Sequence, residues 1–240
     1  MDSSVFLKFI RHVIEGEIET VRKELKATPP LATTSAGVGA TRQESTTYFF
    51  ESIRHYLYAG DTALHMAAAA FRRPMAELLV TYGAEHSPTN RRGAQPLHYA
   101  ADANHWDPKS QAEIIDSLLS IGADANALDK SGVAPLHRAV RTRSEPAVRA
   151  LLDGGANPRL KNKAGSTPLH LAVQTTGRGG SGTDAARCQQ EAIIKLLLER
   201  GAKLTDKDAR GKVVSDSASS DRIRSLLKSI PASEAGSSGS

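Results

Sequence analysis

The chain has 240 residues, of which 40% are hydrophobic and 24% are charged, and its formal net charge is +5. It contains no apolar run long enough to cross a bilayer, and residues 1–9 lack the apolar stretch of a secretory signal, so we expect neither. A single cysteine, Cys188, excludes an intramolecular disulfide and a zinc site built from several cysteines. This cysteine usage fits a reducing compartment and predicts a cytoplasmic protein.

Residues 1–31 are predicted to form two short amphipathic helices. Apolar residues recur at the spacing of one helical face over residues 6–14 and again over residues 18–25, and Gly16 separates the two runs. Two prolines at 29–30 should end the second helix, because a proline inside a helix removes a backbone hydrogen bond. We expect this helix pair to cap the N-terminal end of the array that follows.

The next segment, residues 32–57, is predicted to be a long connection with two different parts. Its first half is polar and rich in glycine and threonine, whereas residues 48–58 hold five of the eleven aromatic residues of the chain. Such side chains either pack over neighbouring helices or stay exposed as anchors for a partner protein. The sequence favours both interpretations equally, and it gives four candidate partner-binding residues: Tyr48, Phe49, Tyr56 and Tyr58.

Four short strings further along the chain are alike. Each ends in a Leu-His pair, which gives His65, His98, His137 and His170, and a glycine stands five residues before each histidine, at Gly60, Gly93, Gly132 and Gly165. The histidines lie 33, 39 and 33 residues apart, and each string is followed later by Leu-Leu and Gly-Ala pairs. A Thr-Pro start, as at residues 167–168, suits the first turn of a helix. The glycines suit turns that need a positive φ.

A period of 33 residues with this string resembles the ankyrin repeat family. The resemblance implies an all-α solenoid of stacked helix-turn-helix units with β-turn fingers, about five to six units including caps. It covers about residues 1–229. It divides the chain into a diverged N-terminal repeat or cap (1–31), a long inserted finger (32–57), four repeats (58–89, 90–128, 129–161 and 162–207), a degenerate C-terminal cap (208–229) and a disordered tail (230–240).

The four histidines raise the question of a metal site. In a stack they would lie one per repeat, too far apart to share an ion whose ligands stand at about 2 Å. The resemblance implies instead that the histidines are structural and bond backbone groups near each turn, and that the four glycines belong to the same signature. We therefore expect no metal and no cofactor.

Two repeats carry extra residues between their helices. Repeat 90–128 has six extra residues near the only tryptophan, Trp106, which is a further candidate for partner binding. Repeat 162–207 has 13 extra residues, which include a glycine-rich run at 177–183. Both insertions should lie on the edge opposite the fingers. The glycine-rich run is expected to be a flexible spacer, because no Lys-Ser or Lys-Thr follows its last glycine as a phosphate-binding loop requires.

The resemblance implies that partners bind on the concave surface, which is built from the finger tips and the exposed residues of the first helix of each repeat. Carried over position by position, this surface contains Arg91, Arg92, Lys130, Lys163 and Arg210 on the fingers, and Asp102, Arg141 and Gln174 on the first helices. Ala69 and Ala70 stand at equivalent helix positions and are expected to be exposed. Because most fingers are basic, a partner with an acidic surface is favoured.

The sequence therefore predicts a monomeric, non-enzymatic scaffold that binds a protein partner on its concave, basic surface, without membrane association. One alternative is polyanion or nucleic-acid binding through the same basic residues, although the aromatic residues lie far along the sequence from the basic stretch 138–163. Another is a regulatory subunit or an enzyme that uses the loop 102–107, where Asp102, His105 and Asp107 lie close in sequence. A deep pocket of ionisable groups at that loop would support it.

Overall fold

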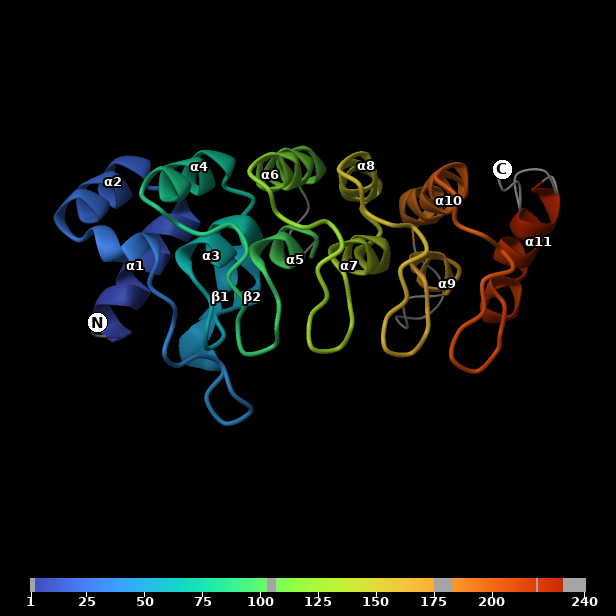
Figure 1. The fold of residues 1–240 in the computed structure, drawn as a ribbon, viewed down its shortest axis with the longest axis horizontal. Coiled ribbons are helices and arrows are strands. Elements are labelled where there is room, and N and C mark those ends of the chain that lie inside the picture. The colour runs from blue at the N-terminus through green and yellow to red at the C-terminus, as the bar shows by residue number, and fades with distance from the viewer. Residues whose placement is uncertain (1–2, 103–106, 175–182, 219, 231–240) are drawn as a thin grey trace.

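The computed structural model describes residues 3–102, 107–174, 183–218 and 220–230. In these ranges the chain is an elongated array of eleven α-helices with one two-stranded sheet, which confirms the predicted all-α solenoid. Most helices stand in two rows, loops project from the array as fingers, and the two ends of the chain lie at opposite ends of the array (Figure 1).

The N-terminal unit consists of α1 (Ser3–Glu15) and α2 (Ile18–Ala27). Gly16, between them, has a φ of +80°, a conformation that costs glycine less than other residues. The apolar faces predicted from the sequence are buried, as at Ile10 and Leu25. A 3₁₀ turn, η1 (Pro29–Ala32), follows α2, and α1 packs against the first helix of the next unit.

Four helix pairs follow, with one helix of each pair in each row (Figure 1). The first helices are α3 (Ala63–Ala69), α5 (Pro96–Ala100), α7 (Pro135–Thr142) and α9 (Pro168–Ala172). The second helices are α4 (Arg73–Thr81), α6 (Pro108–Ser120), α8 (Glu145–Asp153) and α10 (Asp184–Glu199). The array closes with a 3₁₀ turn, η4 (Val214–Ser217), and with α11 (Asp221–Ser229), whose Ile223 and Leu227 are buried.

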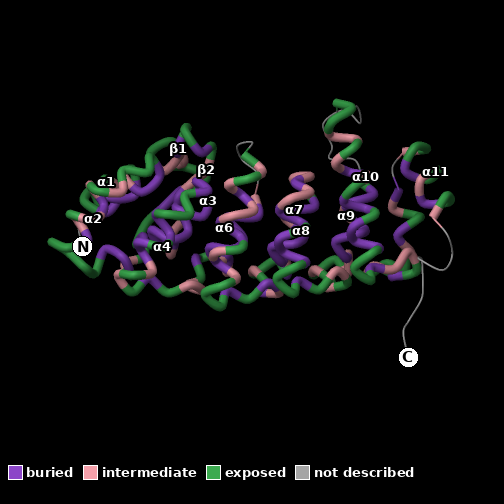
Figure 2. Tube along the Cα trace, turned by 90° about the horizontal axis from the view of Figure 1, so that it is seen from above, coloured by how far each residue is buried: buried purple, intermediate pink, exposed green. Residues whose placement is uncertain are grey.

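The core is a continuous band of apolar residues that runs the length of the array (Figure 2). Alanines such as Ala67 and Ala100 are fully buried, and their small side chains let neighbouring first helices approach closely. The prediction that Ala69 and Ala70 are exposed is wrong. Both are buried, because α3 packs against α1 on one side and α5 on the other. The first helix of this repeat therefore offers a partner no exposed side chain at these two positions.

The insertions lengthen two of the second helices. Helices α6 and α10 have 13 and 16 residues, whereas α4 and α8 have 9 each. All four end at the same place relative to the Gly-Ala pair, so the extra turns lie at the N-terminal ends, where Asp107 and Thr183 cap them through side-chain oxygens. The predicted binding residue Trp106, residues 177–182 of the glycine-rich run and the predicted tail beyond residue 230 lie outside the described residues.

The aromatic segment, residues 46–58, folds back onto the N-terminal end of the array. It contains η2 (Thr46–Tyr48), β1 (Phe49–Phe50), η3 (Glu51–Ile53) and β2 (His55–Tyr56), and the two strands pair antiparallel. Phe50 and Leu57 are buried in the core, whereas Phe49 and Tyr56 are half-buried, with ring centroids 4.7 Å apart. The segment contacts α1 through η3 and lies near α3 (Figures 1 and 2), so it is part of the packed fold.

The four signature glycines let consecutive fingers stack. Gly60, Gly93, Gly132 and Gly165 have φ values of +88°, +73°, +69° and +73°. A Cβ atom on any of them would stand 3.0 Å or less from the backbone of the following finger, for instance 2.9 Å from the nitrogen of Lys163 in the case of Gly132. Each position therefore requires glycine twice, once for the backbone conformation and once for the close approach.

We predict that Gly132→Ala destabilises the chain more than Gly155→Ala. Gly155 also has a positive φ, +88°, but nothing stands within 4 Å of its Cβ position, so alanine there should cost only the conformational penalty of about 1–2 kcal/mol. The Gly132 substitution adds a clash with the next finger, and we expect at least about 1 kcal/mol more. Chemical denaturation measures both free energies. Equal losses would mean that finger stacking does not need the glycine.

Candidate partner-binding site

A buried imidazole joins each repeat to the next. In His65, Nδ1 accepts the N–H of Thr62 at the start of its own helix (3.1 Å), and Nε2 donates to the carbonyl oxygen of Ala94 in the following repeat (3.0 Å). The other three signature histidines repeat this pattern: His98 reaches Val133, His137 reaches Ser166 and His170 reaches Lys212, over 3.0–3.3 Å. Both ring nitrogens are thus used by the backbone, and the bonds fix the tautomer with hydrogen on Nε2.

Burial favours the neutral form of three of these imidazoles. Burial lowers the pKa of His65 and of His98 to about 4, because the interior disfavours the charged ring. Burial lowers the pKa of His137 as well. Among the described residues no group of three His, Cys, Asp or Glu side chains is placed to hold a metal ion.

A buried carboxylate ties the end of the aromatic segment to the next repeat. Asp61 is fully buried and accepts hydrogen bonds from the backbone of Tyr58 (2.6 Å), the amide of Asn90 (2.8 Å) and the hydroxyl of Tyr99 (2.8 Å). Burial raises the pKa of Asp61 to about 6, although the three hydrogen bonds oppose the rise. Tyr99 also packs its ring against His55 of the aromatic segment, with centroids 4.5 Å apart.

Two predicted finger residues hold the same segment from the other side. The guanidinium carbon of Arg92 lies 4.1 Å from the ring centroid of Tyr58, and that of Arg91 lies 5.4 Å from it, both within the range of cation–π attraction. Arg91 also donates to the carbonyl oxygen of Ala40. Tyr58, Arg91 and Arg92, predicted separately as binding residues, therefore form one cluster.

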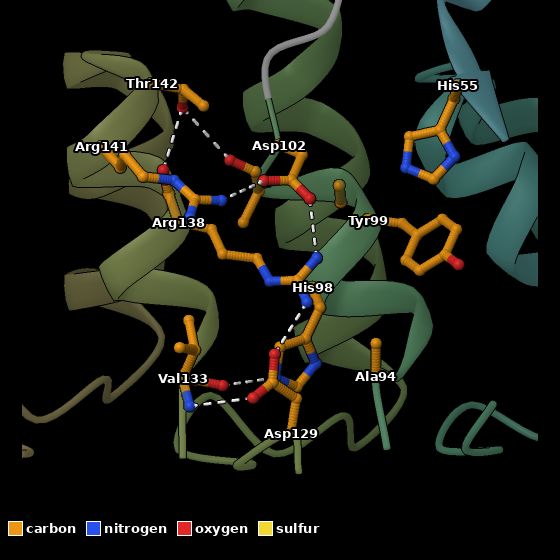
Figure 3. Close-up of polar contacts among 12 residues, drawn as sticks. His55, Ala94, His98, Tyr99, Asp102, Asp129, Val133, Arg138, Arg141 and Thr142 are labelled. Carbon is orange, nitrogen blue, oxygen red and sulfur yellow. Dashed lines mark hydrogen bonds and ion pairs between the residues drawn. The ribbon is translucent and has the colours of Figure 1, made fainter. Parts of the chain in front are cut away.

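The finger at residues 129–133 is joined to α5 through Arg138. This guanidinium donates to Asp102 at the end of α5 (2.6 Å) and to Asp129 on the finger (2.9 Å), and its side chain is only 13% exposed (Figure 3). Burial would lower the pKa of Arg138, but the two carboxylates raise it above its usual value. Arg141, one turn later on α7, lies 3.6 Å from Asp102 and is 63% exposed.

The aromatic segment, the fingers and the first helices enclose an open cavity of about 580 Å³. His55, Tyr58 and Tyr99 form one side of it. Its charged lining residues are five cations and two anions: Arg91, Arg92, Lys130, Arg138, Arg141, Asp102 and Asp129. Burial lowers the pKa of His55, so this ring is neutral at pH 7 and the lining carries an excess of three positive charges.

The structure separates the predicted binding residues into two groups. Arg91, Arg92, Tyr58, Lys130, Arg141 and Asp102 meet around the cavity. Lys163, Gln174 and Arg210 are exposed but lie outside it, and Tyr48, Phe49 and Tyr56 do not line it either. The predicted basic stretch is partly neutralised, because Arg159 pairs with Asp206 and Arg149 pairs with Glu145.

The sequence analysis missed several residues that build the cavity, although signals for some were present. At the position directly after each signature histidine, two repeats have Met or Leu, whereas the others have Tyr99 and Arg138. At the position after each signature glycine, three repeats have Ala, Val or Ser, whereas the first has Asp61. A large polar or charged residue at a position that is apolar or small in the sister repeats indicates a local network. Nothing in the sequence indicated that His55 packs against Tyr99.

The comparisons with known proteins agree with the repeat pattern. A family model described as ankyrin repeats (3 copies) matches residues 108–208, and one described as ankyrin repeat matches residues 59–91. The mouse B-cell lymphoma 3 protein homolog is 33% identical over 90 residues, which are 38% of this chain and 20% of that protein. The putative ankyrin repeat protein FPV031 of Fowlpox virus (strain NVSL) is 35% identical over 88 residues, 35% of this chain and 24% of that protein. The chain therefore spans about a quarter or less of these relatives.

We predict that the free energy of unfolding falls as the pH is lowered from about 6.5 towards 4. In this range the unfolded chain protonates its imidazoles, whereas His65 and His98 stay neutral in the fold, so each costs up to about 1.4 kcal/mol per pH unit. Asp61 acts in the opposite sense below about pH 6, because its raised pKa lets the folded chain bind the proton more tightly. The free energy lost through the two imidazoles exceeds the free energy gained through the one carboxylate, so the net stability falls. Urea denaturation at about pH 7, 6 and 5 checks this, and a constant free energy would contradict it.

A second prediction concerns Arg138. The substitution Arg138→Met should lower the free energy of unfolding by about 3 kcal/mol, because it leaves Asp102 and Asp129 without their main partner in a poorly solvated site. Arg149→Met is the matched control: it removes an exposed pair within one helix and should cost less than about 1 kcal/mol. Thermal or chemical unfolding compares the two variants, and similar losses would rule out a structural role specific to Arg138.

Proposed function

Because the chain belongs to the ankyrin repeat family, whose repeats generally mediate protein–protein interaction, we propose that it is a non-enzymatic module that binds a partner protein on its concave surface. By concave surface we mean the fingers and the first helices α5, α7 and α9. Solenoids of stacked repeats commonly use such an extended surface for binding. The single exposed thiol of Cys188 supports a cytoplasmic location, and we propose that the chain acts as a monomer.

The observation that carries the proposal is the cavity between the aromatic segment and the fingers. It is open to solvent, it contains the exposed side chains of Lys130 and Arg141, and its charges do not cancel. A surface with an excess of one charge attracts a partner surface of the opposite charge. Within the described part of the chain, no helix is long and apolar enough to span a membrane.

Nucleic-acid binding is the weaker candidate, even though the fold brings an aromatic residue close to basic ones. Sequence-tolerant binding of single strands needs aromatic faces on which bases can stack. Tyr58 is the aromatic residue nearest the finger cations, and the guanidinium of Arg92 already lies over its ring. Asp102 and Asp129 also line the cavity, so it is not the uniformly basic groove that follows a phosphate backbone.

A pair of charge-reversed variants tests the proposal. Lys130→Glu combined with Arg141→Glu alters the cavity, whereas Lys109→Glu combined with Arg149→Glu alters two exposed positions on the second helices by the same charge. We expect nuclease-treated extracts to yield proteins that are retained by the wild type and the control and lost at least about tenfold by the cavity variant.

Two outcomes would contradict the proposal. If both variants retain the same proteins as the wild type, the concave surface is not the binding site. The second outcome is that binding disappears on nuclease treatment and that the logarithm of the affinity for an oligonucleotide falls steeply and linearly with the logarithm of the salt concentration. The chain would then bind nucleic acid instead.

A further inference from the structure

We propose that the cavity binds the carboxylate of one acidic side chain, Asp or Glu, that a partner polypeptide supplies. This inference rests on the proposed function and names the chemistry of its contact. Some charged groups around the cavity are already paired with one another, and others remain available to a ligand. The inference follows from this difference.

The anionic groups of the cavity are fully used inside the protein. Asp129 accepts hydrogen bonds from the backbone N–H groups of Ser131 (2.8 Å) and Val133 (3.0 Å) at one oxygen and from Arg138 (2.9 Å) at the other. Asp102 accepts from Arg138 and faces Arg141. Arg138, buried between the two carboxylates (Figure 3), is therefore a structural bridge and is not available to a ligand.

The remaining cations stand around the opening of the cavity. Lys130 is exposed, and no ion pair of its ammonium group occurs among the described residues. Arg141 is 63% exposed, and its one carboxylate neighbour lies 3.6 Å away and is shared with Arg138. Arg92 is exposed and held in place over Tyr58. A single carboxylate entering here would therefore meet cations from two consecutive fingers and from α7.

The aromatic segment prepares the site for such a ligand. Tyr58 orders two guanidinium groups before any ligand arrives, which reduces the side-chain entropy that binding would otherwise cost. His55 and Tyr99 form a neutral wall that keeps water from one side of the cavity, and partial exclusion of water strengthens charge interactions. The segment also closes the cavity at its N-terminal side, so a partner chain would approach along α7 and its finger.

The excess of positive charge in the cavity favours an anion, and Asp and Glu are the side chains that supply one at pH 7 without modification. The two lining carboxylates, Asp102 and Asp129, both pair with Arg138, so Arg91, Arg92, Lys130 and Arg141 outnumber the one negative charge that remains. A phosphoserine would be attracted by the same cations, so the test compares a phosphoserine peptide with a Glu peptide.

Fluorescence anisotropy with defined peptides tests the assignment. The probe is a labelled peptide of alternating Glu and Gly, compared with peptides in which Gln or phosphoserine replaces Glu and with an oligonucleotide of equal length. We expect the Glu peptide to bind the full chain and the Gln peptide not to bind. Lys130→Gln and Arg141→Gln should each weaken binding by about fivefold. Lys109→Gln and Lys195→Gln, which remove the same charge from exposed positions on the second helices α6 and α10, should change it less than about twofold.

Several results would overturn the assignment. Equal weakening by all four variants would mean diffuse attraction to a basic chain, and tighter binding of the phosphoserine peptide or the oligonucleotide would mean a different ligand class. Circular dichroism confirms that each variant is folded. If a partner lost by the charge-reversed variant is not displaced by the Glu peptide, this inference fails and the proposed function stands. If the Glu peptide binds as expected but no protein depends on the concave surface, the proposed function fails alone.

Discussion

One buried imidazole in each repeat holds the first helix of that repeat to the turn of the next. Because Nδ1 accepts a backbone N–H and Nε2 donates to a backbone carbonyl, as in His98, the ring sets both the start of its own helix and the position of the following finger. Backbone hydrogen bonds between consecutive fingers, such as that from the N–H of Lys130 to the carbonyl oxygen of Arg92 (2.9 Å), and the glycine contacts between fingers act with these imidazole bonds to fix the register of the repeats. The cavity depends on this register, since it lies between consecutive fingers and the helices above them.

A second constraint acts only at the N-terminal end. Asp61 accepts three hydrogen bonds, from Tyr58, Asn90 and Tyr99, and thereby joins the aromatic segment to the following repeat. Burial of a carboxylate costs free energy unless such hydrogen-bond partners surround it. The raised pKa of Asp61 reflects this cost. The fold tolerates the cost because the network anchors a long insertion that would otherwise be a free loop. The anchored insertion then forms part of the wall of the cavity through His55 and Tyr58.

The sequence was sufficient to predict the repeats and insufficient to predict how the insertion packs. The period, the signature glycines and the apolar spacing report contacts that recur in each repeat, and these predicted the helices and the stacking. The contact between Tyr58 and Arg92 occurs in one repeat only. It therefore leaves no periodic pattern in the sequence from which it could be predicted. The same reason explains the error at Ala69, where the N-terminal unit covers a position that the repeat pattern leaves open. Where the copies differ, as at Arg138, the sequence did contain a signal.

Differences between repeats also decide where a partner could bind. The equivalent helix positions of two consecutive repeats carry Asp102 and Arg141, which face each other at 3.6 Å, and Arg138 joins the same aspartate. Adjacent repeats thus cancel much of each other's charge, and the basic stretch that looks continuous in sequence is interrupted in space, further along by the pair Arg159–Asp206. Around the cavity beside the aromatic segment, cations still outnumber carboxylates by five to two. This charge excess beside the insertion is the reason why we propose one binding place on the array and not a uniform stripe along it.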